Sequence, residues 1–449
     1  MIRIALVAIV LATTASVAAV TTNSFKLDGA EAFFEGELEH TAVHSEGSVR
    51  VGAATERTEL PNVPLAYSVA HRGDTTFIGT GTSGAVYRVE GKVSRKFADT
   101  GELLVSSLAF GRDGALYAGT LPNGRIYRID PKSGTTKRFA QPEGAKHVWA
   151  LLYDKGRGKL LAATGPEGTI FSVDSIGQAK PLYRAAGSHV MSLASDGRGA
   201  ILAGTSDSAL LLRITSNGSA RVVRDLPGNE VSAIDVVDGR IAVAVNQFKG
   251  APGAQFKASA PAPQKPGAGP RPRPGSGQLW RIEADGRAEM LLAREDTHFT
   301  AVQWGEDGAF FAAGGNGGRL FKGGPDASCS IWGGVEGRQV RARDRRSTRP
   351  LFVTGDGGAV YRVLAGTPKN ATWTSAALDA TFPSSWGRLS WRADGRFVFQ
   401  TRSGNTEEPG ETWSDWSKDL KAPGRILSPA ARFIQVRAKF PKEAKAELR

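Results

Sequence analysis

Short apolar runs alternate with polar turns along most of the chain, and residues 115–130 show this pattern most clearly. The stretch ALYAGTLPNGRIYRID contains an apolar run, a Pro-Asn-Gly turn and a second run in which apolar and polar positions alternate. Asn-Gly between two such runs favours a tight hairpin because both residues tolerate positive φ. We predict a hairpin here, with an inner strand at residues 106–110 and a polar outer strand at residues 135–139.

The same pattern occurs seven times, and a small or apolar residue marks the equivalent position in each copy. These positions are Gly79, Gly119, Ala163, Gly204, Ala244, Ala313 and Val353. The steps between them are 40, 44, 41, 40, 69 and 40 residues. A period near 40 made of short strands is typical of a β-propeller with one four-stranded blade per repeat. We therefore predict an all-β fold with a seven-bladed β-propeller over residues 61–366.

The long step contains an insertion, residues 248–276, in which Pro, Gly and Ala dominate. It carries five basic residues and no acidic one. Such a composition buries too little apolar surface to order itself, so we predict a disordered basic loop. It is either a tolerated insertion or a binding arm. Since it follows the second strand of its blade, we expect it to overhang the face on which the inner strands begin.

The two ends of the chain differ in composition from the repeats. Residues 20–60 form a polar N-terminal extension, and residues 33–40 or 47–52 are candidates for a strand that completes the last blade. Residues 367–442 hold five of the nine tryptophans. Their period-two runs at 396–402 and 431–439 predict a small β-sandwich, fibronectin type III-like or jelly-roll-like, whose completeness the sequence leaves open.

Residues 1–19, MIRIALVAIVLATTASVAA, match a secretory signal peptide: one Arg, a short apolar core and small residues at the end. We expect export to the periplasm, the outer surface or the medium, in a protein that does not span a membrane. Cys329 is the only cysteine, so an internal disulfide is excluded and the core must hold the fold together. We expect a monomer. The net charge of +13 makes an anionic partner conceivable.

Several phrases together resemble a group of exported bacterial β-propeller proteins, mostly without assigned function. The phrases are EGEL at 35–38, TRSGNT at 401–406 and TWSDWS at 412–417. Within a repeat, GRIYRIDPKSG at 124–134 is similar to WD-type and quinoprotein-type propeller repeats. The resemblance covers about residues 30–440 and implies the propeller-plus-tail architecture, but it carries no activity.

The tail also contains Trp413 and Trp416 in a WSxWS pattern that is similar to fibronectin type III domains of cytokine receptors. In those domains tryptophan rings stack with arginines of a neighbouring strand, a role that Arg402 and Arg437 can fill here. The two tryptophans therefore belong either to a structural ladder or to a surface that binds a ligand or partner.

One repeat position carries most of the candidate metal chemistry. Four residues before Leu108, and at the equivalent positions, stand Leu65, Leu104, His147, His189, Glu230, His298 and Arg338. The position begins the inner strand, so His147, His189, Glu230 and His298 should lie around one rim of the central channel. Three imidazoles and a carboxylate are a donor set for zinc, iron or copper. The alternative is a polar lining of a wet channel.

The seventh inner strand differs from the others because arginines occupy positions that are mostly small or apolar elsewhere. Arg338, Arg341 and Arg343 are candidates to bind an anion or a partner at the channel. The alternative is a frayed strand whose arginines extend to solvent.

No nucleophile elbow or phosphate-binding loop is found, and an exported chain without a nucleic-acid module is not expected to bind nucleic acid. We expect a non-catalytic binding or scaffold propeller without a cofactor, whose partner is an envelope protein or a polysaccharide. One alternative is a metal-dependent enzyme of the lyase or oxygenase type, with a divalent transition metal at the histidine position. Another is a carbohydrate-binding adhesin.

Overall fold

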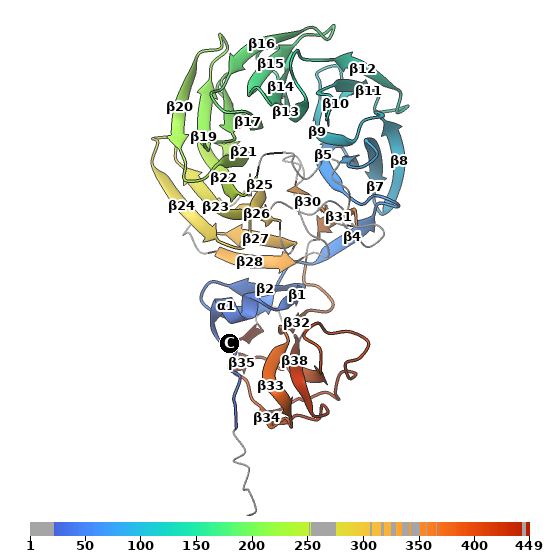
Figure 1. Ribbon diagram of the computed structural model, residues 1–449, viewed down its shortest axis with the longest axis vertical. Coiled ribbons are helices and arrows are strands. Elements are labelled where there is room, and N and C mark those ends of the chain that lie inside the picture. Colours follow the sequence, from blue (N-terminus) through green and yellow to red (C-terminus); the bar gives the residue numbers. More distant parts are fainter. Residues whose placement is uncertain are drawn as a thin grey trace, which may run out of the picture.

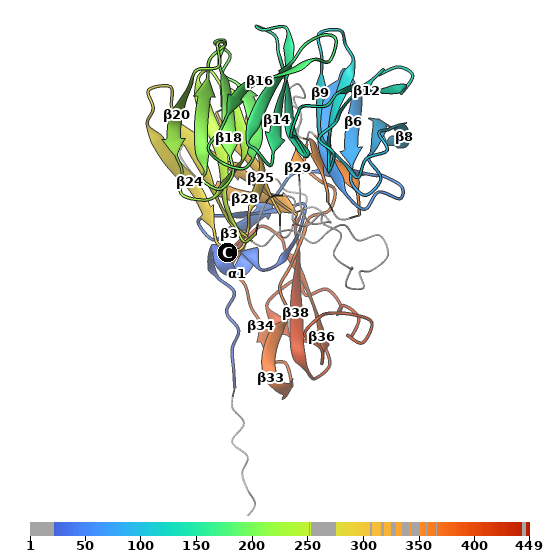
Figure 2. The ribbon, with the colours of Figure 1, turned by 45° about the horizontal axis from the view of Figure 1, so that its top comes forward.

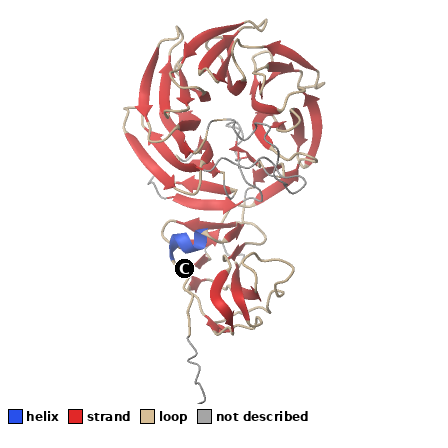
Figure 3. Cartoon of the chain, viewed as in Figure 1, coloured by secondary structure: helices blue, strands red, loops and turns tan. Residues whose placement is uncertain are grey.

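The structure of the chain is a computed structural model that describes residues 22–449. The exceptions are residues 251, 253–274, 306–307, 316–317, 325–328, 335–340, 343–350, 356, 365 and 442–445. The fold is all-β, with antiparallel sheets arranged in a ring and a second group of strands beside it (Figure 1). The short helix α1 (Gly29–Phe34) lies in this second group (Figure 3).

Five consecutive four-stranded sheets follow one another around the ring, each in chain order from its inner to its outer strand. The first comprises β5 (Ala66–Arg72), β6 (Thr75–Thr80), β7 (Ala85–Glu90) and β8 (Val93–Asp99). The second comprises β9 (Leu104–Phe110), β10 (Leu116–Leu121), β11 (Ile126–Ile129) and β12 (Thr136–Ala140). The third comprises β13 (His147–Asp154), β14 (Lys159–Gly165), β15 (Thr169–Val173) and β16 (Ala179–Arg184). The fourth comprises β17 (Val190–Ser195), β18 (Ile201–Thr205), β19 (Leu210–Ile214) and β20 (Ala220–Asp225). The fifth comprises β21 (Glu230–Val237), β22 (Arg240–Phe248), β23 (Gly275–Ile282) and β24 (Ala288–Arg294).

The hairpin predicted at residues 115–130 is confirmed, since β10 and β11 pair antiparallel from Leu116 opposite Ile129 to Gly119 opposite Ile126. Gly124, in the turn, has φ +61°, and a Cβ there would lie 2.2 Å from the carbonyl oxygen of Ala145. The glycine therefore allows both the turn and the close approach of the chain that leads into the next sheet.

The remaining sheets of the ring include strands from the N-terminal part of the chain. One sheet has the order β29 (Arg341–Ala342), β30 (Leu351–Val353), β31 (Ala359–Val363) and β4 (Thr55–Glu59). β4 pairs with β31 from Thr55 opposite Val363 to Glu59 opposite Ala359. Residues 55–59 thus complete the sheet that contains the last repeat, rather than either segment that the sequence favoured, 33–40 or 47–52.

The other sheet extends beyond the ring and contains eight strands. Its ring part is β25 (Phe299–Trp304), β26 (Phe310–Gly314), β27 (Arg319–Gly323) and β28 (Cys329–Gly334). Its outer part is β2 (Thr41–His44), β3 (Ser48–Val51), β39 (Glu447–Leu448) and β35 (Ala393–Asp394). The two parts join where β2 pairs with β28. One continuous sheet therefore connects the ring to the strands beside it (Figure 2).

A five-stranded sheet faces this outer part. β1 (Glu37–Glu39) pairs with β32 (Thr372–Thr374), which pairs with β38 (Ala431–Lys439). β33 (Leu378–Ser384) and β36 (Val398–Gly404) also pair with β38, and β34 (Arg388–Leu389) pairs with β37 (Gly424–Arg425). Residues of both sheets share one hydrophobic core, including Val43, Val49, Trp373, Phe399 and Leu448. We call this unit the tail sheets; it contains strands from both ends of the chain.

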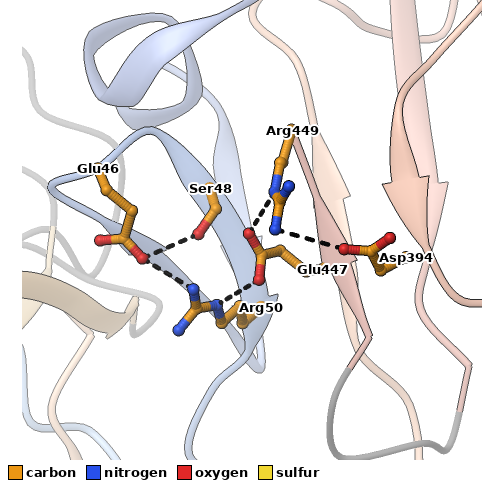
Figure 4. A network of polar contacts seen from close by, with 6 residues as sticks. All are labelled: Glu46, Ser48, Arg50, Asp394, Glu447 and Arg449. Carbon is orange, nitrogen blue, oxygen red and sulfur yellow. Dashed lines mark hydrogen bonds and ion pairs between the residues drawn. The ribbon is translucent and has the colours of Figure 1, made fainter.

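A polar network joins the two chain ends within the tail sheets (Figure 4). Glu447 on β39 accepts hydrogen bonds from Nε of Arg449 (2.6 Å) and from Nε of Arg50 on β3 (3.1 Å). Arg50 also pairs with Glu46 at 2.9 Å, and Arg449 with Asp394 at 3.4 Å. The bonds from Arg449 and Arg50 hold the pKa of Glu447 below its ordinary value. They therefore stabilise the fold above that ordinary pKa, and this contribution is lost as the pH falls.

The core of the ring lies between neighbouring sheets. Leu161 of the third sheet, for example, packs in one cluster with Ile201 of the fourth. Polar contacts join the inner strands as well: Ser68 donates to the carbonyl of Val105, and Ser192 to that of Val231, both at 2.9 Å. The small hydroxyls near the middle of the inner strands therefore link each of these sheets to the next.

In the part of the chain that the structure describes, no helix combines the length and the apolar character that a membrane span requires.

Thr58 on β4 tests the closure of the ring. Its side chain is 4% exposed, and its hydroxyl has no hydrogen-bond partner among the described residues. Thr58→Asp should lower the free energy of unfolding by about 3 kcal/mol or more, because it places an unpaired carboxylate in the closing sheet. Thr58→Val keeps the shape without the hydroxyl and should not destabilise the protein. Equal losses in both variants, measured by denaturant titration, would contradict this role of β4.

Candidate functional site

The four candidate metal ligands occupy equivalent places at the starts of inner strands. His147 pairs with Gly165 on the neighbouring strand, and Glu230 pairs with Asn246. The carbonyls of His189 and His298 accept hydrogen bonds of 2.9 Å from Ser206 and Gly315, which follow the neighbouring strands of their sheets. All four residues therefore lie on one face of the ring, which we call the histidine rim.

His147 and His189 are brought together, with Trp149 of β13 beside them. The ring centroids of the two histidines are 5.5 Å apart, and Trp149 lies 5.1 Å from His147 and 5.7 Å from His189. Trp149 and His189 are almost fully buried. A Cβ at Gly165 would lie 1.9 Å from Nδ1 of His189, so this glycine makes room for the imidazole.

The hydrogen bond between Trp149 and His189 fixes the proton of the imidazole. The indole N–H of Trp149 donates to Nδ1 of His189 at 2.9 Å. Because an indole N–H is only a donor, Nδ1 must be unprotonated, and Nε2 carries the proton in the neutral ring. The Nδ1 lone pair is thus engaged by tryptophan and is not offered to a metal.

Glu230 and His298 make separate contacts farther along the rim. Oε1 of Glu230 accepts a hydrogen bond of 2.8 Å from Ser232, whose hydroxyl accepts one of 2.6 Å from Asn246. The ring of His298 packs 5.0 Å from that of Phe248. Among the described residues, no group of three or more His, Cys, Asp or Glu side chains is placed to hold a metal ion.

A carboxylate beside the rim, Asp207, was not singled out from the sequence. It accepts the backbone N–H of Ser188 at 2.7 Å. Hydrogen bonding with Ser188 is the main cause that lowers the pKa of Asp207, and the nearby His189 adds to the shift. Trp149 was missed as well; it stands where the pairing of β13 with β14 shifts register, which the alternation of the sequence does not reveal.

The long insertion leaves the ring at the histidine rim. β22 and β23 pair as far as Phe248 opposite Gly275, and the Phe248 ring contacts His298. Both ends of the insertion are therefore on the expected face. Residues 251 and 253–274 lie outside the described residues.

The arginine cluster of the last inner strand is described only in part. Arg338 and Arg343 lie outside the described residues. The backbone of Arg341 pairs with Val353, which places it on an inner strand as predicted.

Trp413 and Trp416 form a ladder with arginines, one of the two alternatives that the sequence left open. Arg402 lies 5.6 Å from the ring centroid of Trp413 and 4.6 Å from that of Trp416, and Arg437 lies 3.9 Å from the ring centroid of Trp416. Burial and the neighbouring Arg402 guanidinium lower the pKa of Arg437.

The two serines of the WSDWS motif, Ser414 and Ser417, form hydrogen bonds along the edge of β36. The N–H of Ser414 donates to the carbonyl of Ser403 at 2.9 Å, and that of Ser417 to Thr401 at 2.8 Å. The hydroxyls of Ser414 and Ser417 accept the N–H groups of the same two residues. The motif thus covers an edge that would otherwise be unpaired.

Two adjoining pockets lie on the opposite face of the ring, where inner strands end. The first, of about 490 Å³, is lined by Arg72, Phe110, Gly111, Arg112, Gly114, Tyr153 and Lys155. The second, of about 340 Å³, is lined by Arg112, Asp113, Tyr117, Phe139, Tyr153, Gly158, Leu160, Val173, Asp174 and Ser175. They share Arg112 and Tyr153. Sequence reasoning missed them because the walls of the first come from three repeats and those of the second from two.

No protein-family model matches this sequence, and no curated protein matches it. Solved structures resemble it in fold. Virginiamycin B lyase from Staphylococcus aureus is 11% identical, with a TM-score of 0.53, over 69% of this chain and 99% of the lyase. The WD40 β-propeller domain of Doa1 is 9% identical, with a TM-score of 0.51, over 70% of this chain and 96% of that domain.

The extracellular domain of BT3049 from B. thetaiotaomicron, described as a hybrid two component system, is 14% identical, with a TM-score of 0.51. The match covers 84% of this chain and 58% of that one. At these identities the likeness shows the β-propeller fold alone.

Trp149→Phe tests the hydrogen bond that fixes His189. In the wild type, nitrogen NMR of ¹⁵N-histidine-labelled protein should show the Nε2–H tautomer for His189. The substitution removes the indole donor, so the tautomer balance should shift toward Nδ1–H. Trp304→Phe, at another buried tryptophan of an inner strand, is the control and should leave His189 unchanged. A wild type already in the Nδ1–H form would contradict the geometry.

Proposed function

We propose that this chain is an exported, non-catalytic binding or scaffold protein that engages an envelope protein or a polysaccharide. Its frame is a seven-bladed β-propeller with a small C-terminal β-sandwich, as the sequence repeats and the sheets together favour. Export rests on residues 1–19, which match a signal peptide and lie outside the described residues. The proposal includes no cofactor and no nucleic-acid partner, and the protein acts as a monomer.

One observation carries the non-catalytic part of the proposal: polar groups of the inner strands are engaged within the ring. Nδ1 of His189 accepts from Trp149, and Oε1 of Glu230 accepts from Ser232. Asp235, which is 1% exposed, accepts the backbone N–H of Trp304 in the next sheet at 2.9 Å. The bonds of His189 and Asp235 join neighbouring sheets, and that of Glu230 lies within β21, so all three groups take part in holding the structure together.

The fold by itself is compatible with both a binding function and a catalytic one. The similar solved structures include a lyase and a WD40 domain, and both use the propeller frame. The binding proposal is supported by the two adjoining pockets, which give a partner a defined place on the face opposite the histidine rim.

One contact supports the alternative of a metal-dependent enzyme, of lyase or oxygenase type. His147 and His189 are neighbours, with ring centroids 5.5 Å apart, on the same face as Glu230 and His298. The adhesin alternative has less support, because Arg402 and Arg437 both contact the ring of Trp416, which thereby belongs to the ladder.

The proposal is tested with the purified chain and a panel of envelope polysaccharides and isolated envelope proteins. Binding is measured by calorimetry, and the mass of each bound ligand is measured after prolonged incubation. We expect saturable binding of at least one ligand with no change in its mass. His147→Ala/His189→Ala should bind that ligand with the same affinity, because the proposal gives the rim a structural role.

Turnover of the ligand would overturn the proposal. Stoichiometric zinc, iron or copper that is present in the wild type and absent from the His147→Ala/His189→Ala variant, together with turnover that the variant loses, would establish the enzyme instead. A panel in which nothing binds would also count against a binding role.

A further inference from the structure

The larger of the two pockets is cationic. Arg72, Arg112 and Lys155 line it, together with the rings of Phe110 and Tyr153, and no acidic side chain does. The three cations come from the ends of β5, β9 and β13 or the turns that follow. Three neighbouring sheets therefore each bring one positive charge to the same place.

The cations differ in how they are held. One guanidinium N–H of Arg72 donates to the carbonyl of Gly114 at 2.7 Å, and the group lies 5.6 Å from the Phe110 ring centroid. These contacts orient Arg72 while leaving further N–H groups for a ligand. The side chains of Arg112 and Lys155 are exposed and make no ion pair or hydrogen bond among the described residues.

The acidic residues next to Arg112 and Lys155 in the sequence already form ion pairs with other arginines. Asp113 pairs with Arg128 at 2.9 Å, and Asp154 pairs with Arg157. They therefore do little to neutralise Arg112 and Lys155, and the pocket keeps a positive potential that favours an anionic group. A guanidinium group can donate two parallel hydrogen bonds to a carboxylate, and a lysine ammonium beside it adds a third positive contact. The pocket therefore fits a carboxylate.

The smaller pocket adds a different surface beside the first. Tyr117 and Phe139 form an edge-to-face pair with centroids 5.0 Å apart, and Tyr153 belongs to both pockets. The carboxylates of Asp113 and Asp174 also line it. Aromatic faces accept the apolar face of a sugar ring, and carboxylates accept hydrogen bonds from its hydroxyls.

We infer that the two pockets form one site for an acidic oligosaccharide. The carboxylate of a uronic acid unit binds Arg72, Arg112 and Lys155, and the next sugar ring lies against Phe139 and Tyr153. Because the pockets adjoin, the site takes at least two linked units rather than a free anion. This inference rests on the proposed binding function and names its ligand class and its site.

Calorimetry with hexagalacturonate tests the site. Arg112→Ala/Lys155→Ala should weaken binding at least about tenfold, because it removes two charge-assisted contacts. The matched control is Lys137→Ala/Arg138→Ala, which removes two exposed charges from β12 of the second sheet, the sheet whose turn carries Arg112, and should bind as the wild type does. Raising the salt concentration should weaken wild-type binding more than binding by the Arg112→Ala/Lys155→Ala variant.

Four comparison ligands define the specificity. Neutral maltohexaose, monomeric galacturonate, polyglutamate and a sulfated hexasaccharide without carboxylates should each bind at least about tenfold more weakly than hexagalacturonate. Equal binding of maltohexaose would overturn the role of charge, and equal binding of the monomer would overturn the two-pocket site. Equal binding of polyglutamate or of the sulfated ligand would overturn the assignment to a uronic acid.

The outcomes separate this inference from the function on which it rests. If the wild type binds hexagalacturonate and Arg112→Ala/Lys155→Ala binds it equally, the site is wrong and the binding function stands. If the wild type binds other envelope ligands but not hexagalacturonate, the ligand class is wrong. If it cleaves hexagalacturonate to shorter fragments, the non-catalytic proposal fails.

Discussion

The pairing of β4 with β31 is the constraint on which the rest of the structure depends. A ring of sheets has a first and a last member, and its closure requires strands from distant parts of the chain. Here residues 55–59 lie against residues 359–363. The chain before β4 already runs through both tail sheets, because β1 pairs with β32 and β2 with β28. The same N-terminal segment therefore closes the ring and joins the tail sheets to it.

The same need to hold sheets together explains where the polar residues of the ring are used. The hydroxyl of Ser68 and the carboxylate of Asp235, both on inner strands, bond to the neighbouring sheet, and so does the amide of Asn246 on β22, the second strand of its sheet. In the cationic pocket, Arg72 bonds to the carbonyl of Gly114 in the next sheet, whereas the side chains of Arg112 and Lys155 are exposed. The two exposed cations support the binding proposed for the face opposite the histidine rim.

Local patterns could be predicted from the sequence, whereas contacts between distant segments could not. The hairpin of β10 and β11 follows from its own turn and alternation. The ladder of Trp413 and Trp416 with Arg402 and Arg437 is one of the two alternatives that the WSxWS pattern gave. Residues 55–59 (TERTE) alternate weakly and have only Thr58 buried, so nothing local marks them as the closing strand. The pockets likewise form only where neighbouring repeats meet.

Native-state hydrogen exchange tests the central claim, that the N-terminal strands hold the ring closed, most directly. Peptides that contain β4 and β2 should exchange as slowly as those that contain β10 and β18, since all open only with the whole structure. Fast exchange in β4, with β10 and β18 still protected, would show that the ring stays closed without the N-terminal strand and would contradict the account.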